Sequence, residues 1–510
     1  MSTTISLHTQ FQIGEVDPQL FGVHAEHLGR CIYEGIYDPK SSHADDDGIR
    51  TDVLAALREL GHTHLRWPGG NFTSGYHWMD GVGPRDQRPT LHEVAWNSIE
   101  TNHFGTDECM ALCRKMGCEP MLAVNLGTGT PEEAWFWSQY CNDPAGSSEA
   151  PVTRYAAMRV ANGHPDPYDV RMWVMGNELD VATQPGYTPA HEYAVRAFQT
   201  ARLMKGIDLG FNDRLKIIYG GSCNVEYRSY LEWDRQVLEY VYENDPEGKY
   251  IDYINLHRYA HNWNDDTADF LGFSNAIDEQ IEQMDAVCRF AAGKHRVPRR
   301  AYLVCDEWGV WYKDHRTDGA GKFAPHLIEE VFNLQDALVI AMFLNSFLRH
   351  ADVLKIASLS QMVNVLSPLL TDGDRMLRQS IFYAFKMFSD RKNGTSLTTR
   401  VNGPTYETAT YGRVPYIDSS AILDGNRLSV FLINRRLDTE EVVRLEVSDR
   451  RIESIENGEV LTDDDPKAAN SYEDPDRIRS VSFDQVKMDG RGAEITMPPL
   501  SLVALTLRLA

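Results

Sequence analysis

Two short apolar runs of this chain each end in a glutamate. Residues 172–178 read Met-Trp-Val-Met-Gly-Asn-Glu, and residues 302–308 read Tyr-Leu-Val-Cys-Asp-Glu-Trp. An ionised carboxylate beside a hydrophobic core is costly unless it is paired, so an acid at such a place indicates a strand end that opens onto a functional cleft. Either glutamate alone could be an ordinary strand-end charge. Together, Glu178 and Glu307 predict chemistry carried out by a pair of acids.

The elements that position these acids follow a βα repeat. From about residue 18 to 385, short apolar runs alternate with longer segments of helical period, which is typical of a parallel sheet. Eight repeats favour a (β/α)₈ barrel, an α/β fold. A doubly wound sheet is the rival, but it usually has a glycine-rich phosphate loop after its first strand, and this chain lacks one. The expected strands are 20–23, 63–67, 120–125, 172–176, 216–221, 252–257, 302–306 and 354–361.

In such a barrel, the residues that end the strands converge at one face. The residues that end these runs carry amide, carboxylate and aromatic groups, which suit the hydroxyls and the apolar faces of sugars. Singly, each has a plainer explanation: Arg66 as a structural ion pair, His257 as a strand-end histidine, Asn125 and Gln361 as loop ties. The candidates are Glu26, Arg66, Asn71, Asn125, Asn177, Glu178, His257, Tyr259, Glu307, Trp311 and Gln361.

The two acids follow the fourth and seventh expected strands, which lie on opposing sides of a barrel mouth. Glycoside cleavage needs two such carboxyl groups, about 5–5.5 Å apart for retention of configuration or about 6.5–9.5 Å apart for inversion. Arg66 could hold one glutamate ionised. Burial, together with the negative charge of that ionised glutamate, would raise the pKa of the other glutamate.

The pattern changes after about residue 386 to alternating strands with almost no helix, which predicts a β-sandwich. Expected turns include 424–426 and Asn457-Gly458, and the acidic stretch 462–476 is expected to be an exposed loop. The first residues alternate as well. We therefore expect an N-terminal strand within 1–17 that joins the sandwich, a catalytic barrel over 18–385 and a C-terminal β-sandwich over 386–510.

Composition restricts the partners. The chain has 510 residues, with 50 basic and 74 acidic side chains and a formal charge of −24, which disfavours nucleic acids and anionic membranes. The N-terminus lacks the basic and apolar regions of a signal peptide, so a cytoplasmic location is expected. Cys109, Cys113 and Cys118 lack a CxxC or a matched histidine pair, so we expect neither a metal nor another cofactor.

The chain contains five longer motifs at the expected strand ends: FGVHAEHLGR (21–30), RWPGGNF (66–72), VNLGTG (124–129), GNE (176–178) and DEW (306–308). They resemble the α-L-arabinofuranosidases of glycoside hydrolase family 51. The resemblance covers nearly the whole chain and implies a retaining exo-hydrolase with Glu178 as general acid/base and Glu307 as nucleophile. It also implies that Glu26, Asn71, Asn177 and Gln361 hold the sugar hydroxyls, that Arg66 and Tyr259 lie near the nucleophile, and that His257 and Trp311 wall the pocket.

The resemblance further implies a metal-independent homo-oligomer, often a hexamer, that acts on arabinofuranosyl oligosaccharides from arabinan or arabinoxylan. Two positions depart from the family's usual pattern, Ala260 and Gly309, and both are expected on the leaving-group side. The rival enzyme is an endo-β-glucanase or a xylanase/β-xylosidase on the same barrel. It would need an open cleft, whereas the segment 71–102 is long enough to close a pocket. A non-catalytic sugar-binding protein is the alternative from another class.

Overall fold

Eight parallel strands form a closed barrel in the computed structural model, which describes residues 3–206, 213–313, 319–489 and 492–510. Around the ring the order is β10-β11-β12-β3-β4-β7-β8-β9. All eight strands coincide with the apolar runs expected from the sequence, so the (β/α)₈ prediction is confirmed. The barrel strands are β3 (Gly22–His24), β4 (His64–Trp67), β7 (Glu119–Val124), β8 (Met172–Met175), β9 (Lys216–Tyr219), β10 (Tyr253–Ala260), β11 (Tyr302–Val310) and β12 (Leu354–Ser360).

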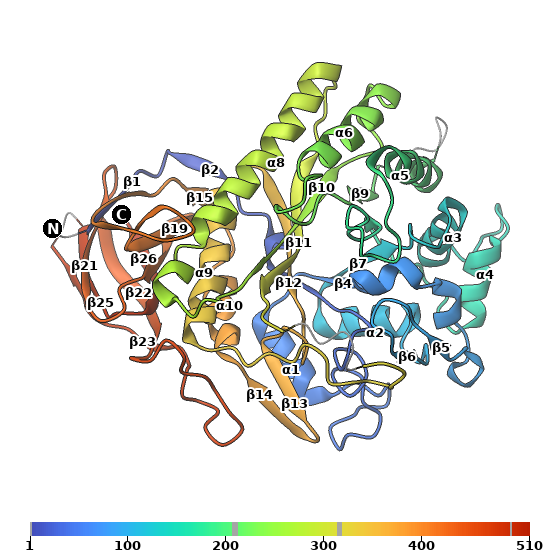
Figure 1. The fold of residues 1–510 in the computed structure, drawn as a ribbon, viewed down its shortest axis with the longest axis horizontal. Helices are drawn as coiled ribbons and strands as arrows, with labels where there is room; N and C mark the ends of the chain where they lie inside the picture. The colour runs from blue at the N-terminus through green and yellow to red at the C-terminus, as the bar shows by residue number, and fades with distance from the viewer. Residues whose placement is uncertain (1–2, 207–212, 314–318, 490–491) are drawn as a thin grey trace.

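Helices surround the barrel, and α9 and α10 lie between the barrel and the C-terminal strands (Figure 1). Because α9 is covered on both sides, its residues from Leu334 to Leu348 are all buried. None of the helices in the described part of the chain is both long and apolar enough to cross a membrane. The helices are α1 (Thr51–Leu60), α2 (Thr106–Met116), α3 (Pro131–Asn142), α4 (Arg154–Ala161), α5 (Ala190–Lys205), α6 (Glu232–Asn244), α7 (Thr267–Phe270), α8 (Ser274–His295), α9 (Leu334–Arg349) and α10 (Ser380–Ser389).

The ladder of the barrel is irregular beside β11. The pairing of β10 with β11 shifts between Asn255 and His257, and that of β11 with β12 shifts between Cys305 and Trp308. Such a bulge breaks the two-residue alternation of side chains along a strand. Consecutive residues of β11, Asp306 and Glu307, can therefore both contact the same group inside the barrel.

The C-terminal strands, together with β1 and β2, form two mainly antiparallel sheets. Their strand orders are β16-β1-β21-β25-β24 and β2-β15-β19-β20-β26-β22-β23. Strand β1 pairs in parallel with β21, so the chain's first strand lies in this sandwich. The remaining strands are β1 (Thr3–Leu7), β2 (Gln12–Glu15), β5 (Leu91–His92), β6 (Ile99–Glu100), β13 (Leu369–Asp372), β14 (Arg375–Arg378), β15 (Thr395–Leu397), β16 (Arg400–Asn402), β17 (Thr405–Glu407), β18 (Arg413–Pro415), β19 (Ile417–Asp424), β20 (Arg427–Asn434), β21 (Glu441–Val447), β22 (Ile452–Thr462), β23 (Val481–Ser482), β24 (Val486–Met488), β25 (Gly492–Met497) and β26 (Ser501–Leu509).

One turn expected from the sequence is wrong. Asn457-Gly458 lies inside β22, which pairs along its length with β26. Two register shifts in this pairing disturb the apolar alternation by which a strand is recognised. Gly458 is needed for close approach instead, because a Cβ there would lie 2.4 Å from the carbonyl oxygen of Phe483. The turn expected at 424–426 does connect β19 and β20.

The barrel and the sandwich share a hydrophobic core, in which Phe388 of α10 stacks on Phe431 of β20 with ring centroids 4.0 Å apart. A buried polar cluster lies beside this contact. Asp418 of β19 accepts a hydrogen bond from the amide of Asn345 at 2.8 Å and pairs with Arg349 at 3.1 Å and Arg435 at 3.3 Å. This one carboxylate therefore balances two cations at the interface.

Replacing this carboxylate tests how firmly the two modules are joined. We expect Asp418→Ala to lower the free energy of unfolding by about 3–5 kcal/mol, because it leaves the buried Arg435 without its counter-ion, while Arg349 keeps its pair with Asp278 at 2.8 Å. Urea denaturation followed by circular dichroism measures the change. The matched control is Asp464→Ala, at an exposed position of the same module. A change for Asp418→Ala no larger than the control's would show that the cluster does not join the modules.

Candidate active site

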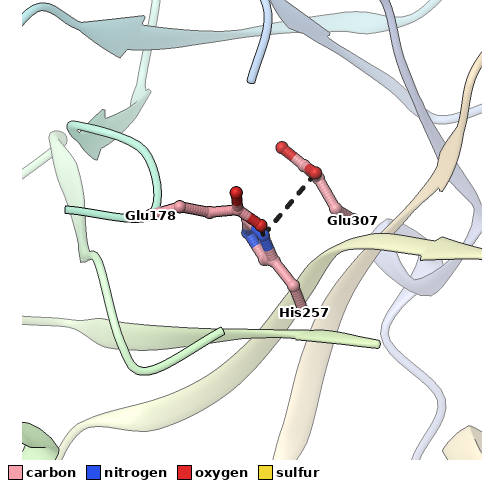
Figure 2. A group of neighbouring side chains, drawn as sticks. All are labelled: Glu178, His257 and Glu307. Carbon is pink, nitrogen blue, oxygen red and sulfur yellow. Dashed lines mark hydrogen bonds and ion pairs between the residues drawn. The ribbon is translucent and has the colours of Figure 1, made fainter. Parts of the chain in front are cut away.

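Glu178 and Glu307 face each other across the mouth of the barrel. Glu178 follows β8 and Glu307 lies on β11, with β9 and β10 between these strands in the ring. An oxygen of each carboxylate lies within 4.8 Å of the other, with His257 between them (Figure 2). The Glu178 side chain is 17% exposed and that of Glu307 is 7% exposed. A bound molecule can thus reach both carboxylates in a largely enclosed site.

Arg66 of β4 fixes one side of this pair. Its Nη1 donates to Oε1 of Glu307 at 2.8 Å, and its Nη2 donates to Oδ1 of Asn177 at 2.6 Å. Its Nε lies 2.8 Å from Oδ2 of Asp306. The guanidinium is completely buried, which opposes its charge, but the charges of Asp306 and Glu307 outweigh burial and raise the pKa of Arg66. Arg66 is therefore a permanent cation that orients Glu307.

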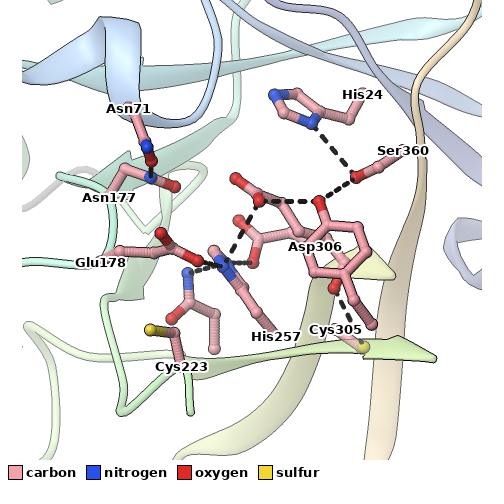
Figure 3. Close-up of polar contacts among 12 residues, drawn as sticks. His24, Asn71, Asn177, Glu178, Cys223, His257, Cys305, Asp306 and Ser360 are labelled. Atoms are coloured by element: carbon pink, nitrogen blue, oxygen red, sulfur yellow. Dashed lines mark hydrogen bonds and ion pairs between the residues drawn. The ribbon is translucent and has the colours of Figure 1, made fainter. Parts of the chain in front are cut away.

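The other oxygen of Glu307 is held by Tyr259 of β10. The Tyr259 hydroxyl lies 3.0 Å from Oε2 of Glu307 and 3.0 Å from the hydroxyl of Ser360, which in turn contacts His24 (Figure 3). Burial raises the pKa of Glu307, while the nearby cations His257 and Arg66 lower it and limit the rise. Trp311 packs edge-on against Tyr259, with ring centroids 5.1 Å apart. Glu307 is thus fixed at both of its oxygens.

His257 links three acids. Its Nδ1 lies 2.8 Å from Oε1 of Glu178 and 3.6 Å from Oε2 of Glu307, and its Nε2 lies 3.0 Å from Oδ1 of Asp306. Burial lowers the pKa of His257, but the charge of Glu307 and the bonds to Asp306 and Glu178 raise it well above its usual value. Both ring nitrogens then carry protons. One donor atom each from Glu178, His257 and Glu307 lies within 4.8 Å of the other two, which is close enough to hold a metal ion.

The pKa of Glu178 depends on the proton carried by His257. Burial raises the pKa of the Glu178 carboxyl, but the hydrogen bond and charge of His257, with the amide of Gln184 at 2.8 Å, bring it below its usual value. A carboxylate beside an imidazolium and a carboxylic acid beside a neutral imidazole contain the same single proton. The Glu178–His257 pair thus holds one proton along a 2.8 Å hydrogen bond.

A further carboxylate, Glu26, borders the site on the side of Glu307. Its Oε1 accepts from the backbone N–H of Phe72 at 2.9 Å and from Nε1 of Trp96 at 3.0 Å, and Nε2 of Gln361 lies 3.3 Å from its Oε2. Burial and the charge of Glu307 raise the pKa of Glu26 to about 7. Near neutral pH, Glu26 can therefore accept a hydrogen bond as a carboxylate or donate one as an acid.

Amide side chains link Asn71 to Glu178. The side-chain oxygen Oδ1 of Asn71 accepts hydrogen bonds from Nδ2 of Asn177 at 3.2 Å and from Nε2 of Gln184, which also donates to Glu178. Gly69 and Gly70 form the wall between Asn71 and the strand β4. A Cβ at Gly70 would lie 2.6 Å from Oε1 of Glu307 and 3.2 Å from Oε2 of Glu26. Only a bare backbone fits at this wall.

The structure thus brings ten of the residues expected from the sequence around one site and places Asn125 outside it. The side chain of Asn125 bonds to Tyr76, Gly127 and Thr128, so it ties a loop. Ala260 is completely buried, and a Cβ at Gly309 would lie 3.4 Å from the backbone oxygen of Ser360, so the place of both toward the leaving group stays a prediction. The ten are Glu26, Arg66, Asn71, Asn177, Glu178, His257, Tyr259, Glu307, Trp311 and Gln361.

Three side chains of the site were not expected as candidates. Asp306 precedes Glu307, and strand alternation would point it away, but the bulge in β11 brings it to Arg66 and His257. Trp96 comes from the long segment expected to close the pocket, yet no periodic pattern singles it out. Gln184 lies in the loop after β8. Its only signal was its place six residues after Glu178.

Sequence comparisons identify relatives over nearly the full length. The profile of the "alpha-L-arabinofuranosidase 1 domain" matches residues 56–285, and that of the "alpha-L-arabinofuranosidase C-terminal domain" matches residues 306–501. An intracellular exo-α-(1→5)-L-arabinofuranosidase of Acetivibrio thermocellus is 36% identical over 92% of each chain. An exo-α-(1→6)-L-arabinofuranosidase of Bifidobacterium longum is 35% identical over 98% of this chain and 96% of the relative.

The fold gives the same result. The solved structure of a family 51 α-L-arabinofuranosidase from Bifidobacterium longum superposes with a TM-score of 0.92, at 32% identity and over 99% of both chains. The agreement includes the sandwich as well as the barrel, because the whole chain is covered. The second of the two profiles begins at residue 306, within β11, so it spans the last barrel strands together with the sandwich.

One more acid in this region yields a prediction about pH. Asp180 is buried two residues after Glu178, and one of its oxygens accepts the backbone N–H of Cys223 at 3.2 Å. Burial, followed by the charges of Glu178 and Asp234, raises the pKa of Asp180 to about 7. The folded protein therefore binds a proton there that the unfolded chain releases near pH 4. The stability from this proton is complete in acid and is lost as the pH rises toward 7.

We therefore expect Asp180→Asn to gain stability relative to the wild type as the pH rises from about 4.5 to about 7.5, by up to about 1.4 kcal/mol per pH unit, and to level off above that. Unfolding free energies measured at several pH values give this difference directly. Asp166→Asn, at an exposed position, is the control and should show no such trend. A pH-independent difference for Asp180→Asn would contradict the raised pKa.

Proposed function

The chain belongs to the α-L-arabinofuranosidases of glycoside hydrolase family 51, and we propose that Glu178 and Glu307 hydrolyse its substrate by a retaining mechanism. It is an exo-acting glycosidase that removes terminal non-reducing α-L-arabinofuranosyl residues. The observation that supports the paired roles best is the approach of the two carboxylates within 4.8 Å from opposite sides of the mouth. The retaining separation of about 5–5.5 Å leaves no room for a water molecule between nucleophile and sugar.

In the first step, the carboxylate of Glu307 attacks the anomeric carbon, and the bond from that carbon to the leaving-group oxygen breaks. Glu178 transfers a proton to this oxygen as it departs. Arg66 and Tyr259 support the assignment of Glu307 as the nucleophile, because they hold both of its oxygens. The product of this step is a β-linked arabinofuranosyl ester of Glu307.

In the second step, Glu178 removes a proton from water, the water oxygen bonds to the anomeric carbon, and the ester bond breaks. Two inversions restore the α configuration and regenerate the carboxylate of Glu307. His257 serves this cycle by sharing its Nδ1 proton with Glu178. A carboxylate of lowered pKa can thereby become an acid when the leaving group arrives. This role is larger than the pocket wall that the resemblance implied for His257.

The remaining residues bind the sugar in this proposal. Glu26 accepts hydrogen bonds from hydroxyls, and Asn71, Asn177 and Gln361 bind them through their amides, as expected from the resemblance. Trp96 extends this set, because its Nε1 contacts the same oxygen of Glu26 as the backbone of Phe72. Trp311 contributes an aromatic wall beside Tyr259.

We further propose that the natural substrates are arabino-oligosaccharides within the cell and that the protein is a cytoplasmic homo-oligomer, with a hexamer as the assembly that the resemblance implies. The relative of Acetivibrio thermocellus is named intracellular and α-(1→5)-specific, whereas that of Bifidobacterium longum is named α-(1→6)-specific. The linkage preference is therefore tested by offering an α-(1→5)-linked and an α-(1→6)-linked arabinofuranoside. The rival endo-β-glucanase and xylanase/β-xylosidase activities are not favoured, since the chain matches these two arabinofuranosidases over almost all of their length.

A panel of substrates tests the activity. We expect release of nitrophenol from nitrophenyl α-L-arabinofuranoside and of arabinose from arabino-oligosaccharides, because both carboxylates lie in a largely enclosed site. Nitrophenyl β-xyloside and soluble β-glucan should react at least about 10²-fold more slowly, since sites built to bind specific hydroxyls reject other sugars strongly. Faster hydrolysis of the glucan or the xyloside would overturn the proposal.

The two acids should differ in how they depend on the leaving group. Glu178→Ala should keep most of its glycosylation rate on the nitrophenyl substrate, because a nitrophenolate leaves without a proton, but lose about 10²–10⁴-fold on an arabino-oligosaccharide. Glu307→Ala should be nearly inactive on both, because it lacks the atom that forms the ester. Pre-steady-state and steady-state rates measure this contrast. Glu192→Ala, on an exposed face of α5, is the control.

Azide reports the same assignment through stereochemistry. It should restore activity on the nitrophenyl substrate in both variants and give the α-azide from Glu178→Ala, which still forms the β-linked ester. Direct attack in Glu307→Ala should give the inverted β-azide. The opposite pair of configurations, read by proton NMR, would mean that the roles are exchanged.

A further inference from the structure

Three exposed aromatic side chains lie on consecutive loops at the mouth of the barrel. Tyr187, Tyr227 and Trp263 follow β8, β9 and β10, which are neighbours in the ring and lead to the region of Glu178 and His257. Trp263 is 69% exposed. A large apolar surface left in water at the entrance of a site is a feature of binding surfaces.

Trp263 is held in a defined orientation. Its ring stacks on His261 with centroids 3.7 Å apart and an interplanar angle of 21°, and its Nε1 donates to the backbone carbonyl of Tyr312 at 3.4 Å. One face of the indole is therefore covered, and most of the rest is open to solvent. A platform fixed in advance loses little conformational entropy when a ligand binds it.

The loop that carries Trp263 is supported from outside the barrel. Asn262 and Thr267, on either side of Trp263, both donate to Oε1 of Gln335 at 3.2 and 2.9 Å. The backbone N–H of Gln335 in turn donates to the carbonyl oxygen of Pro466 in the sandwich at 3.0 Å. Asp265 pairs with Lys467 at 2.5 Å. The sandwich thus buttresses this part of the mouth.

A chain of contacts leads from the nucleophile to Trp263. Glu307 contacts Tyr259, Tyr259 packs against Trp311, and Tyr312, next to Trp311, accepts the hydrogen bond from Trp263. On the loop after β9, Cys223 lies near Glu178 and His257 (Figure 3). Four residues further on, burial raises the pKa of Tyr227, and the charges of Cys223 and Glu178 contribute. The loops after β9 and β10 therefore border the site on the side of Glu178.

A leaving group whose oxygen is beside Glu178 lies next to this border. On the basis of the proposed function, we infer that Trp263, with Tyr227 on the neighbouring loop, binds the sugar ring on the leaving-group side by stacking against its C–H face. The sugar is a neutral one. Glu226 and Asp265 lie on the same two loops, and the chain carries a net charge of −24, both of which disfavour an acidic sugar.

Two substrates with leaving groups of similar basicity isolate this contact. Methyl α-L-arabinofuranoside has no sugar to stack on Trp263, whereas α-1,5-linked arabinotriose does. We expect Trp263→Ala to lower kcat/KM for arabinotriose about tenfold, the size expected for losing one apolar stacking contact, and to change it less than about twofold for the methyl glycoside. Trp263→Phe keeps an aromatic face and should recover most of the arabinotriose activity.

Phe290→Ala is the matched control, because Phe290 is an exposed aromatic residue on α8, near the end of that helix remote from the mouth. It should affect neither substrate. Equal losses by Trp263→Ala on both substrates, or no loss on arabinotriose, would overturn the inference. A wild-type enzyme that hydrolyses neither glycoside would instead refute the proposed function, and with it this inference.

Discussion

The buried guanidinium of Arg66 is the interaction on which the site depends. It contacts Asp306, Glu307 and Asn177, which come from β11 and from the end of β8, while Arg66 itself belongs to β4. Carboxylates this deeply buried are tolerable only when they are paired and hydrogen-bonded. Arg66 and the imidazolium of His257 together supply that compensation. The contacts that compensate for the burial of these acids also fix their positions for catalysis.

Much of this arrangement could be predicted from the sequence, because two simple regularities hold. Apolar runs indicated all eight barrel strands, and polar residues at their ends, such as Arg66 and Glu307, indicated the site. Both regularities fail where the backbone is irregular. The bulge in β11 brings Asp306 to the same side as Glu307. The register shifts in β22 disturb its apolar alternation, so the sequence around Asn457-Gly458 predicts a turn where the structure has a strand. Trp96 reaches Glu26 from a long loop, which only the three-dimensional fold positions.

The sandwich is part of the enzyme's working structure. Asp418 of β19 balances two arginines at the junction with α9, and the loop around Pro466 supports the N-terminal end of α9, where Gln335 holds the Trp263 loop. Alternative explanations, in which the sandwich is an independent carbohydrate-binding appendage, do not account for a hydrophobic core shared with the barrel. The two modules fold around the same buried helix.

The glycine wall beside β4 limits how the pocket can evolve. At Gly70, even a methyl group would occupy the space next to Glu307 and Glu26, so substitutions there cannot gradually enlarge or reshape the sugar site. Variation is available instead on the leaving-group side, where Trp263 is carried by an exposed loop. A lineage built on this scaffold can therefore diversify in what is attached to the terminal sugar far more readily than in the terminal sugar itself.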